Sequence, residues 1–244
     1  MGNAKSSNVA HTATPTHIME ESQEAFRQLL PLLKSVDASN SDGLLVTFLK
    51  EYHSEVPLAS LYHLLYTSDS PDDIPPLSIP DSDFDQPDVS ARTTKGLQLC
   101  HFILEAFKSP ETFQGGIVHN PTLGTVNFHE FLRSFLAIKI LFGSLKQVEK
   151  PNMSVSRVSL YKVYYILCQK LIHKSHNDSE SWRSQQSIIF GESKMGKIFK
   201  LVYPNSKKKR LGKRGESKLH YVGFKWNDSM VDDEIRSLLN LRIA

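Results

Sequence analysis

Apolar residues recur every three or four positions through most of this chain, a pattern that predicts amphipathic helices. The predicted helices begin at Ile18 and then cover residues 43–52, 58–66, 93–108, 127–145, 157–171, 192–203 and about 232–241. Pro31 lies inside the first helix and is expected to bend or split it. Residues 1–17 lack the pattern and are predicted to be disordered.

Two short segments near the C-terminus suit β-strands instead of helices. They cover residues 207–211 and 218–226, and Gly212 and Gly215 lie in the turn between them. Three helices followed by a β-hairpin are the element order of a winged helix. We therefore expect a mainly α fold, in which a helical N-terminal region precedes a C-terminal winged helix with a β-hairpin wing.

The segment 67–90 separates the helical regions. It contains five Pro and seven Asp but no Lys or Arg, so it is predicted to be an exposed linker. The alternative is an acidic docking peptide, anchored by Ile74, Leu77, Ile79 and Phe84. The expected division is a disordered start at 1–17, helical regions at 18–66 and 91–126 around the linker, the winged helix at 127–228 and a C-terminal helix at 229–244.

Positive charge is concentrated in one part of the chain. From Phe190 to Trp226 there are eleven Lys or Arg and two acidic residues, whereas the whole chain has a net charge of +3. A cluster of this density indicates a surface for a polyanion, and nucleic acid is the best candidate.

The helix at 192–203 carries part of this charge. Its lysines recur every three residues on one broad face: Lys194, Lys197 and Lys200. We expect the opposite face to pack on the core through Ile198, Leu201 and Val202. The lysine face would then be free for phosphates or a groove, although lysines on helices often face only solvent.

The predicted wing offers two kinds of donor. Arg210 and Arg214 can each present a bidentate fork to guanine O6 and N7, or bridge two phosphates. The lysines of the hairpin suit phosphates as point charges: Lys207, Lys208, Lys209, Lys213 and Lys218. Ser217 can also donate to phosphate. His220 and Tyr221 are neighbours on a strand, so one of them should face the core and the other outward.

The wing sequence resembles the DNA-binding domain of the regulatory factor X (RFX) family. The residues that match its pattern are Arg210, Leu211, Gly212, Arg214, Gly215, Ser217, Lys218, His220, Tyr221 and Gly223. Leu219 departs from the family, where an aromatic residue is common. The resemblance implies that the wing enters the major groove of an X-box element and that the third helix lies over the minor groove. It makes Arg210, Arg214, Lys218 and Tyr221 wing contacts, with His220 as a further one, and Lys194 and Lys197 contacts from the third helix.

These features favour a sequence-specific, duplex-DNA-binding transcription regulator. The alternative is a DNA-contacting subunit of a chromatin-remodelling or other nuclear complex, with residues 18–150 as its protein-docking part. We find no motif of catalysis and expect no enzymatic activity and no cofactor. The run Lys207–Arg214 resembles a nuclear localisation signal, so we expect the protein in the nucleus.

The remaining motifs change this picture little. Cys100 and Cys168 lack zinc-site spacing and are predicted to be core thiols, and no metal is expected at His173 and His176. Gly2 fits the N-myristoylation template, although a polar disordered start is the alternative. One acyl chain anchors weakly, and no apolar run is long enough to span a bilayer, so we expect no stable membrane association.

Overall fold

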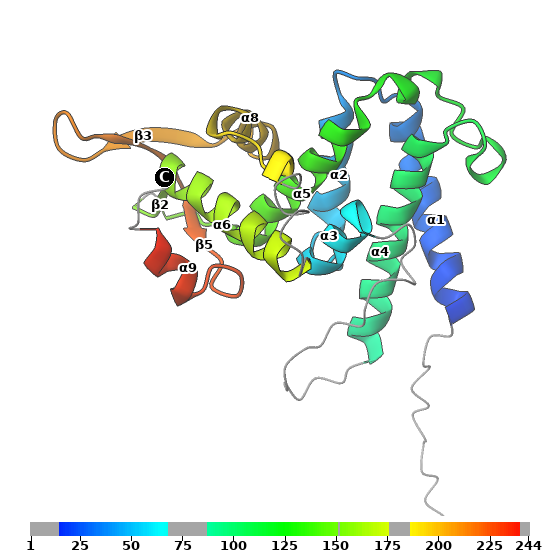
Figure 1. Ribbon diagram of the computed structural model, residues 1–244, viewed down its shortest axis with the longest axis horizontal. Coiled ribbons are helices and arrows are strands. Elements are labelled where there is room, and N and C mark those ends of the chain that lie inside the picture. The colour runs from blue at the N-terminus through cyan, green and yellow to red at the C-terminus, as the bar shows by residue number, and fades with distance from the viewer. Residues whose placement is uncertain (1–14, 68–86, 151, 176–185, 240–244) are drawn as a thin grey trace, which may run out of the picture.

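The computed structural model describes residues 15–67, 87–150, 152–175 and 186–239. Figure 1 shows a helical body from which a long β-hairpin extends. The helices are α1 (Pro15–Lys34), α2 (Ser41–Tyr52), α3 (Leu58–Tyr66), α4 (Pro87–Lys108), α5 (Phe128–Ser144), α6 (Arg157–Ser175), α8 (Glu192–Val202) and α9 (Asp233–Leu238), with short 3-10 helices at Phe113–Gly115, Pro121–Thr125 and Gln186–Ile188. The strands are β1 (Leu145–Gln147), β2 (Ser154–Ser156), β3 (Lys207–Leu211), β4 (Lys218–Val222) and β5 (Phe224–Trp226). The mainly α fold with a C-terminal winged helix is confirmed.

The N-terminal helices differ from expectation at their ends. Helix α1 begins at Pro15, inside the segment 1–17 that was predicted to be disordered, and it continues through Pro31 as one helix. Its last turns pack their apolar side chains on the core, which offsets the backbone hydrogen bond that proline removes. Helix α4 begins at Pro87, inside the predicted linker, because proline is well tolerated in a first helical turn. Gly2 and the docking anchors Ile74, Leu77, Ile79 and Phe84 lie outside the described residues, as does His176.

Helix α5 is the centre of the molecule. It packs against α2 and α3 on one side and against α6 and α8 on the other. The Asn127 side chain accepts a hydrogen bond from the Glu130 backbone amide at 3.0 Å and so caps the start of α5. Phe135 is fully buried and meets Phe48 of α2 edge to face, with ring centroids 5.9 Å apart. The N-terminal helices and the winged helix therefore share one apolar core.

The winged helix consists of α5, α6 and α8 with two small sheets. Strands β2, β4 and β3 form an antiparallel sheet in that order, and β1 pairs with β5. The three-residue strands β1 and β2 were not predicted, since their pattern is too short to read and their partners are distant in sequence. The single strand expected at 218–226 is divided into β4 and β5 at Gly223.

Gly223 allows this division because its backbone has φ of +83°, a left-handed conformation that disfavours a Cβ atom. A Cβ placed there would also lie 3.2 Å from the Val148 carbonyl oxygen. We expect Gly223→Ala to lower the free energy of unfolding by about 2 kcal/mol, from conformational cost plus this contact. Gly215→Ala is the matched control, since Gly215 has φ of +88° and no atom near the added Cβ. Equal losses in urea unfolding of the two variants would show that the Val148 contact has no effect.

A buried lysine joins α5 to the end of α2. Lys139 is 6% exposed, and its ammonium donates to the His53 carbonyl oxygen, where α2 ends. Burial lowers the pKa of Lys139 to about 8, because the charged form loses its hydration. Burial and the nearby Lys139 also lower the pKa of His53.

The lysine should make folding depend on pH in a defined window. The pKa of Lys139 falls from 10.5 to about 8 on folding, so between these values the unfolded chain binds more protons and stability rises with pH. We expect the free energy of unfolding of the wild type, relative to that of Lys139→Met, to rise by about 3 kcal/mol at most across this window. Urea unfolding of both proteins at matched pH values measures the difference, and a flat difference would contradict the shift.

Helix α9 closes the described chain on the surface of α6. Asp232 caps it by accepting from the Ile235 amide at 2.8 Å, and Ile235 is buried. Lys170 of α6 reaches Glu234 at 2.6 Å. The C-terminal helix expected within 229–244 is thus present as a short element at Asp233–Leu238.

Cys100 and Cys168 are buried free thiols, as predicted. Across the described ranges, no group of three His, Cys, Asp or Glu side chains is placed to hold a metal ion. Within these same ranges, no helix has the length and apolar character needed to cross a bilayer.

Candidate nucleic-acid interface

The wing is the β3–β4 hairpin, residues 207–222. Its strands pair antiparallel, with Lys207 opposite Val222 and Leu211 opposite Lys218. Gly212 and Gly215 in the connecting turn have φ of +121° and +88°, which makes this tight reversal accessible. Strand β2 pairs with the base of β4, but the outer part of the hairpin has no neighbouring strand among the described residues and extends away from the helices (Figure 1). The hairpin can therefore enter a groove without displacing the body.

Exposed cations line the wing from its base to its turn. They are Lys207, Lys208, Lys209, Arg210, Lys213, Arg214 and Lys218. None of them forms an ion pair with a carboxylate of the described residues. Their charges are accordingly available to a polyanion, and the pattern of the sequence located all of them.

Cross-strand pairing sorts these cations between the two faces of the hairpin. Lys208 and Arg210 lie opposite Tyr221 and Leu219, on the face that continues onto α8. Lys207 and Lys209 lie on the other face, and Lys209 is opposite His220. The cations therefore surround the hairpin and do not form a single stripe.

Arg210 is held across the hairpin. Its Nη1 atom donates to the Ser217 carbonyl oxygen at 3.2 Å and lies 3.4 Å from the Ser217 hydroxyl oxygen. Ser217 is half-buried, so its hydroxyl partly serves to orient this guanidinium. Arg214 lies in the turn itself and is exposed, with the Lys213 carbonyl accepting from the Glu216 amide beneath it. Arg214 is therefore the arginine with the more open approach.

His220 and Tyr221 alternate as expected, and the alternation decides their roles. His220 is half-buried, on the face it shares with Lys209 and with Ser156 of β2, and its Nδ1 lies 2.9 Å from the Lys218 carbonyl oxygen. Tyr221 is 1% exposed, and its ring stacks on Phe199 of α8 with centroids 3.7 Å apart. The same burial raises the pKa of Tyr221. Tyr221 is thus part of the core at the wing base, and its predicted contact with DNA stays a prediction.

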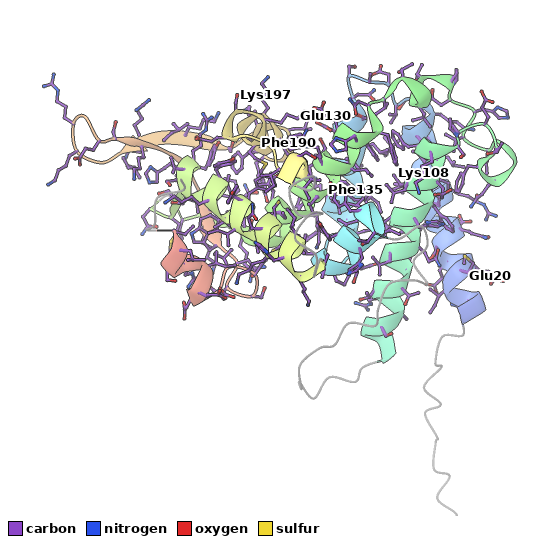
Figure 2. All side chains as sticks on the ribbon, viewed as in Figure 1. Glu20, Lys108, Glu130, Phe135, Phe190 and Lys197 are labelled. Atoms are coloured by element: carbon purple, nitrogen blue, oxygen red, sulfur yellow. The ribbon has the colours of Figure 1, made fainter. Side chains whose placement is uncertain are left out.

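Helix α8 presents its cations unequally. Lys197 and Lys200 are exposed, and Figure 2 shows Lys197 on the outer edge of the helix. Lys200 also donates to the Pro204 carbonyl oxygen at the end of the helix. Both remain accessible to a ligand that approaches the outer side of α8.

Lys194 is engaged by acids from two other helices. Its Nζ donates to Glu130 of α5 at 2.6 Å and lies 3.7 Å from Asp42 of α2. The hydrogen bond from Lys194 lowers the pKa of Glu130. The ammonium also lies 5.4 Å from the centre of the Phe190 ring. The structure thus places Lys194 at a contact between α8 and the preceding helices, away from the open lysine face.

Leu201 was expected on the buried side of α8 but lies on the open side. The buried side is formed by Met195, Ile198, Phe199 and Val202. Leu201 is 42% exposed and follows Lys197 by one helical turn. Leu201 lies three residues after Ile198 and four after Lys197, so its spacing is compatible with either the buried or the lysine face of the helix. Only the packing of α8 on the core decided which face it occupies.

Arg157, the first residue of α6, was not among the predicted site residues. Its Nε lies 3.0 Å from the Glu192 carboxylate at the start of α8, and its guanidinium lies beside Gly196. A lone arginine at a helix start carries no signal of its own, so the sequence could not have indicated this role. Arg157 thus links the start of α6 to the first turns of α8.

Comparison with known proteins agrees with this geometry. Residues 137–228 match the family model of the RFX DNA-binding domain. Protein sak1 of Schizosaccharomyces pombe is 32% identical over 77 residues, which are 32% of this chain and 8% of that protein. The chain therefore matches only a small part of that relative's length. No solved structure matches the chain.

The matched residues contain the second half of α5 and all of β1, β2, α6, α8, the wing and β5, and they end at Asp228. These are the elements that carry the exposed cations, and the family to which they are matched binds DNA and is not catalytic. Helices α1 to α4 lie outside the match. The chain carries an RFX DNA-binding domain, a winged helix of the kind found in transcription regulators, at residues 137–228.

Proposed function

We propose that the protein is a sequence-specific regulator of transcription that binds duplex DNA in the nucleus. The wing enters the major groove of an X-box-like element, and α8 lies over the adjacent minor groove. The observation that carries this proposal is the projecting hairpin, whose cations have no carboxylate partner among the described residues and which belongs to the matched RFX segment.

The dimensions and chemistry of the wing support this arrangement. A two-stranded β-ribbon fits the width of the major groove of B-DNA. Arg214 at the tip offers two parallel donors for guanine O6 and N7, and Arg210 offers the same once it exchanges its Ser217 contact for a base edge. The strand lysines Lys207 to Lys209, with Lys213 and Lys218, suit phosphates on the groove walls.

Helix α8 supplies the second set of contacts in this proposal. Lys197 and Lys200 are exposed and can meet phosphates at the minor groove, Lys200 by exchanging its hydrogen bond to the Pro204 carbonyl for one to a phosphate. Lys194 holds α8 to α5 and α2 and contributes no phosphate contact while its acids are in place. The run Lys207–Arg214 supports entry to the nucleus as an import signal, since importin and DNA need not bind at once.

The test is a random-site selection with the purified full chain, followed by binding measurements on the recovered duplex. We expect an enriched sequence, and paired half-sites would reveal dimeric binding. If roughly five phosphates are neutralised, the logarithm of the association constant should fall against the logarithm of salt with a slope near −4.5. A binding constant that does not change between about 50 and 200 mM salt would refute the proposal.

A second function is supported by one observation. Helices α1 to α4 lie outside the matched domain, yet they share its core through α5, and α2 also touches α8. The whole body could thus be the docking part of a chromatin-remodelling or other nuclear complex whose DNA contact has little sequence preference. Recovery of the chain in a stable large assembly from nuclear extract, together with no enrichment in the selection, would favour this function.

A further inference from the structure

Leu201 is the one apolar side chain of α8 that the core does not use. It is 42% exposed, whereas the four apolar residues on the inner side of the helix are at most 8% exposed. Lys197 lies one turn before it on the same face, and Lys200 directly precedes it; both are exposed. An exposed leucine beside two exposed lysines has no favourable partner in water, so this face is suited to a ligand that places apolar surface next to anionic groups.

Duplex DNA has this arrangement. The phosphates of the two strands form the edges of a groove, and the deoxyribose rings and base edges between them are less polar. An apolar protein ligand would not complement the two ammonium groups, nor the cations of the wing that follow α8 in the chain. The charge of the surroundings therefore selects a nucleic acid as the occupant of this face.

We propose that Leu201 packs against the deoxyribose rings and the floor of the minor groove, beside phosphates held by Lys197 and Lys200. This inference rests on the proposed function, which places α8 over that groove. Guanine carries a 2-amino group that projects into the minor groove, whereas A·T pairs lack it. Leu201 thereby favours A·T pairs beneath α8, so the helix contributes to sequence preference without a base hydrogen bond.

The first experiment separates this apolar contact from an ionic one. We expect Leu201→Ala to weaken binding to the selected duplex by roughly tenfold, the loss that follows from uncovering part of a leucine side chain. The slope of binding against salt should stay unchanged. Lys197→Gln is the matched control on the same face, and it should reduce that slope by about 0.9. The free energy of unfolding of Leu201→Ala should stay near that of the wild type, because the side chain is exposed.

The second experiment reads the groove floor. Inosine keeps the O6 and N7 atoms of guanine, which the wing reads in the major groove, and lacks only the 2-amino group of the minor groove. The wild type should bind an inosine-substituted selected duplex more tightly than the guanine duplex, and Leu201→Ala should lose most of this gain. Equal gains in both proteins would overturn the contact with the groove floor.

The two proposals fail in different ways. If Leu201→Ala bound the duplex with the affinity and salt slope of the wild type, the role of Leu201 would be overturned. The proposed function would still stand if wing variants such as Arg214→Ala changed the base preference. Absence of any enriched duplex in the selection would overturn the proposed function itself. If Leu201→Ala bound the duplex more weakly and its salt slope also changed, the substitution would have disturbed a lysine contact. That result would also overturn the apolar role of Leu201.

Discussion

Tyr221→Ala is expected to lower the free energy of unfolding by about 3–5 kcal/mol, the loss typical of removing a large aromatic side chain from a packed core. The ring is 1% exposed, stacks on Phe199 of α8 and lies opposite Val155 of β2. Truncation would leave a cavity at the place where the wing sheet meets the third helix. Urea unfolding followed by circular dichroism measures the loss.

Tyr221→Phe is the control that separates a core role from a DNA contact. It keeps the stacked ring and removes only the hydroxyl, so we expect stability and affinity for the selected duplex both to stay close to the wild type. Had Tyr221 contacted DNA through its hydroxyl, Tyr221→Phe would bind the duplex more weakly while folding normally. That result would require the wing base to open on binding.

Arg214→Ala is expected to weaken binding to the selected duplex by about 1–3 kcal/mol, as for the loss of a bidentate contact to guanine. Its guanidinium is exposed in the turn of the wing, and no described carboxylate pairs with it. The base preference at one position should relax in a repeated random-site selection. Stability should change little, since the side chain is exposed.

The matched control for Arg214 is Lys209→Ala, on the same hairpin and equally exposed. A lysine on a phosphate carries no sequence information, so this variant should weaken all duplexes alike and reduce the salt slope by about 0.9. If Arg214→Ala behaved in the same way as Lys209→Ala, the tip of the wing would be a phosphate contact and the base reading would have to lie elsewhere.

Much of the wing could be predicted from sequence because its signals are local. The strand at 207–211, the start of the second strand at 218, the glycine turn and the exposed cations all follow from neighbouring residues, whereas the division of the expected strand 218–226 at Gly223 does not. The same is true of α5, α6 and α8, whose bounds agree with the predicted helices to within a few residues. Local patterns of charge and periodicity set these features, and packing altered only their ends.

The candidate site differs from the prediction where a distant partner decides. Lys194 resembles Lys197 in sequence, yet Glu130 and Asp42 from two other helices surround it. Leu201 could have joined the core and instead lies outside it, because the inner face of α8 is centred on Phe199 and its neighbours. Strands β1 and β2 exist only through pairing with β5 and β4.

By itself, the sequence determined where the charge lies, where the helices and the hairpin form, and which domain family they resemble, since each of these depends on residues close together along the chain. The tertiary structure decided which of those residues a ligand can reach. The stacking of Tyr221 on Phe199 and the ion pairs of Lys194 join segments far apart in sequence. Burial and pairing across such distances depend on how α2, α5, α8 and the wing pack, and no local pattern records that packing.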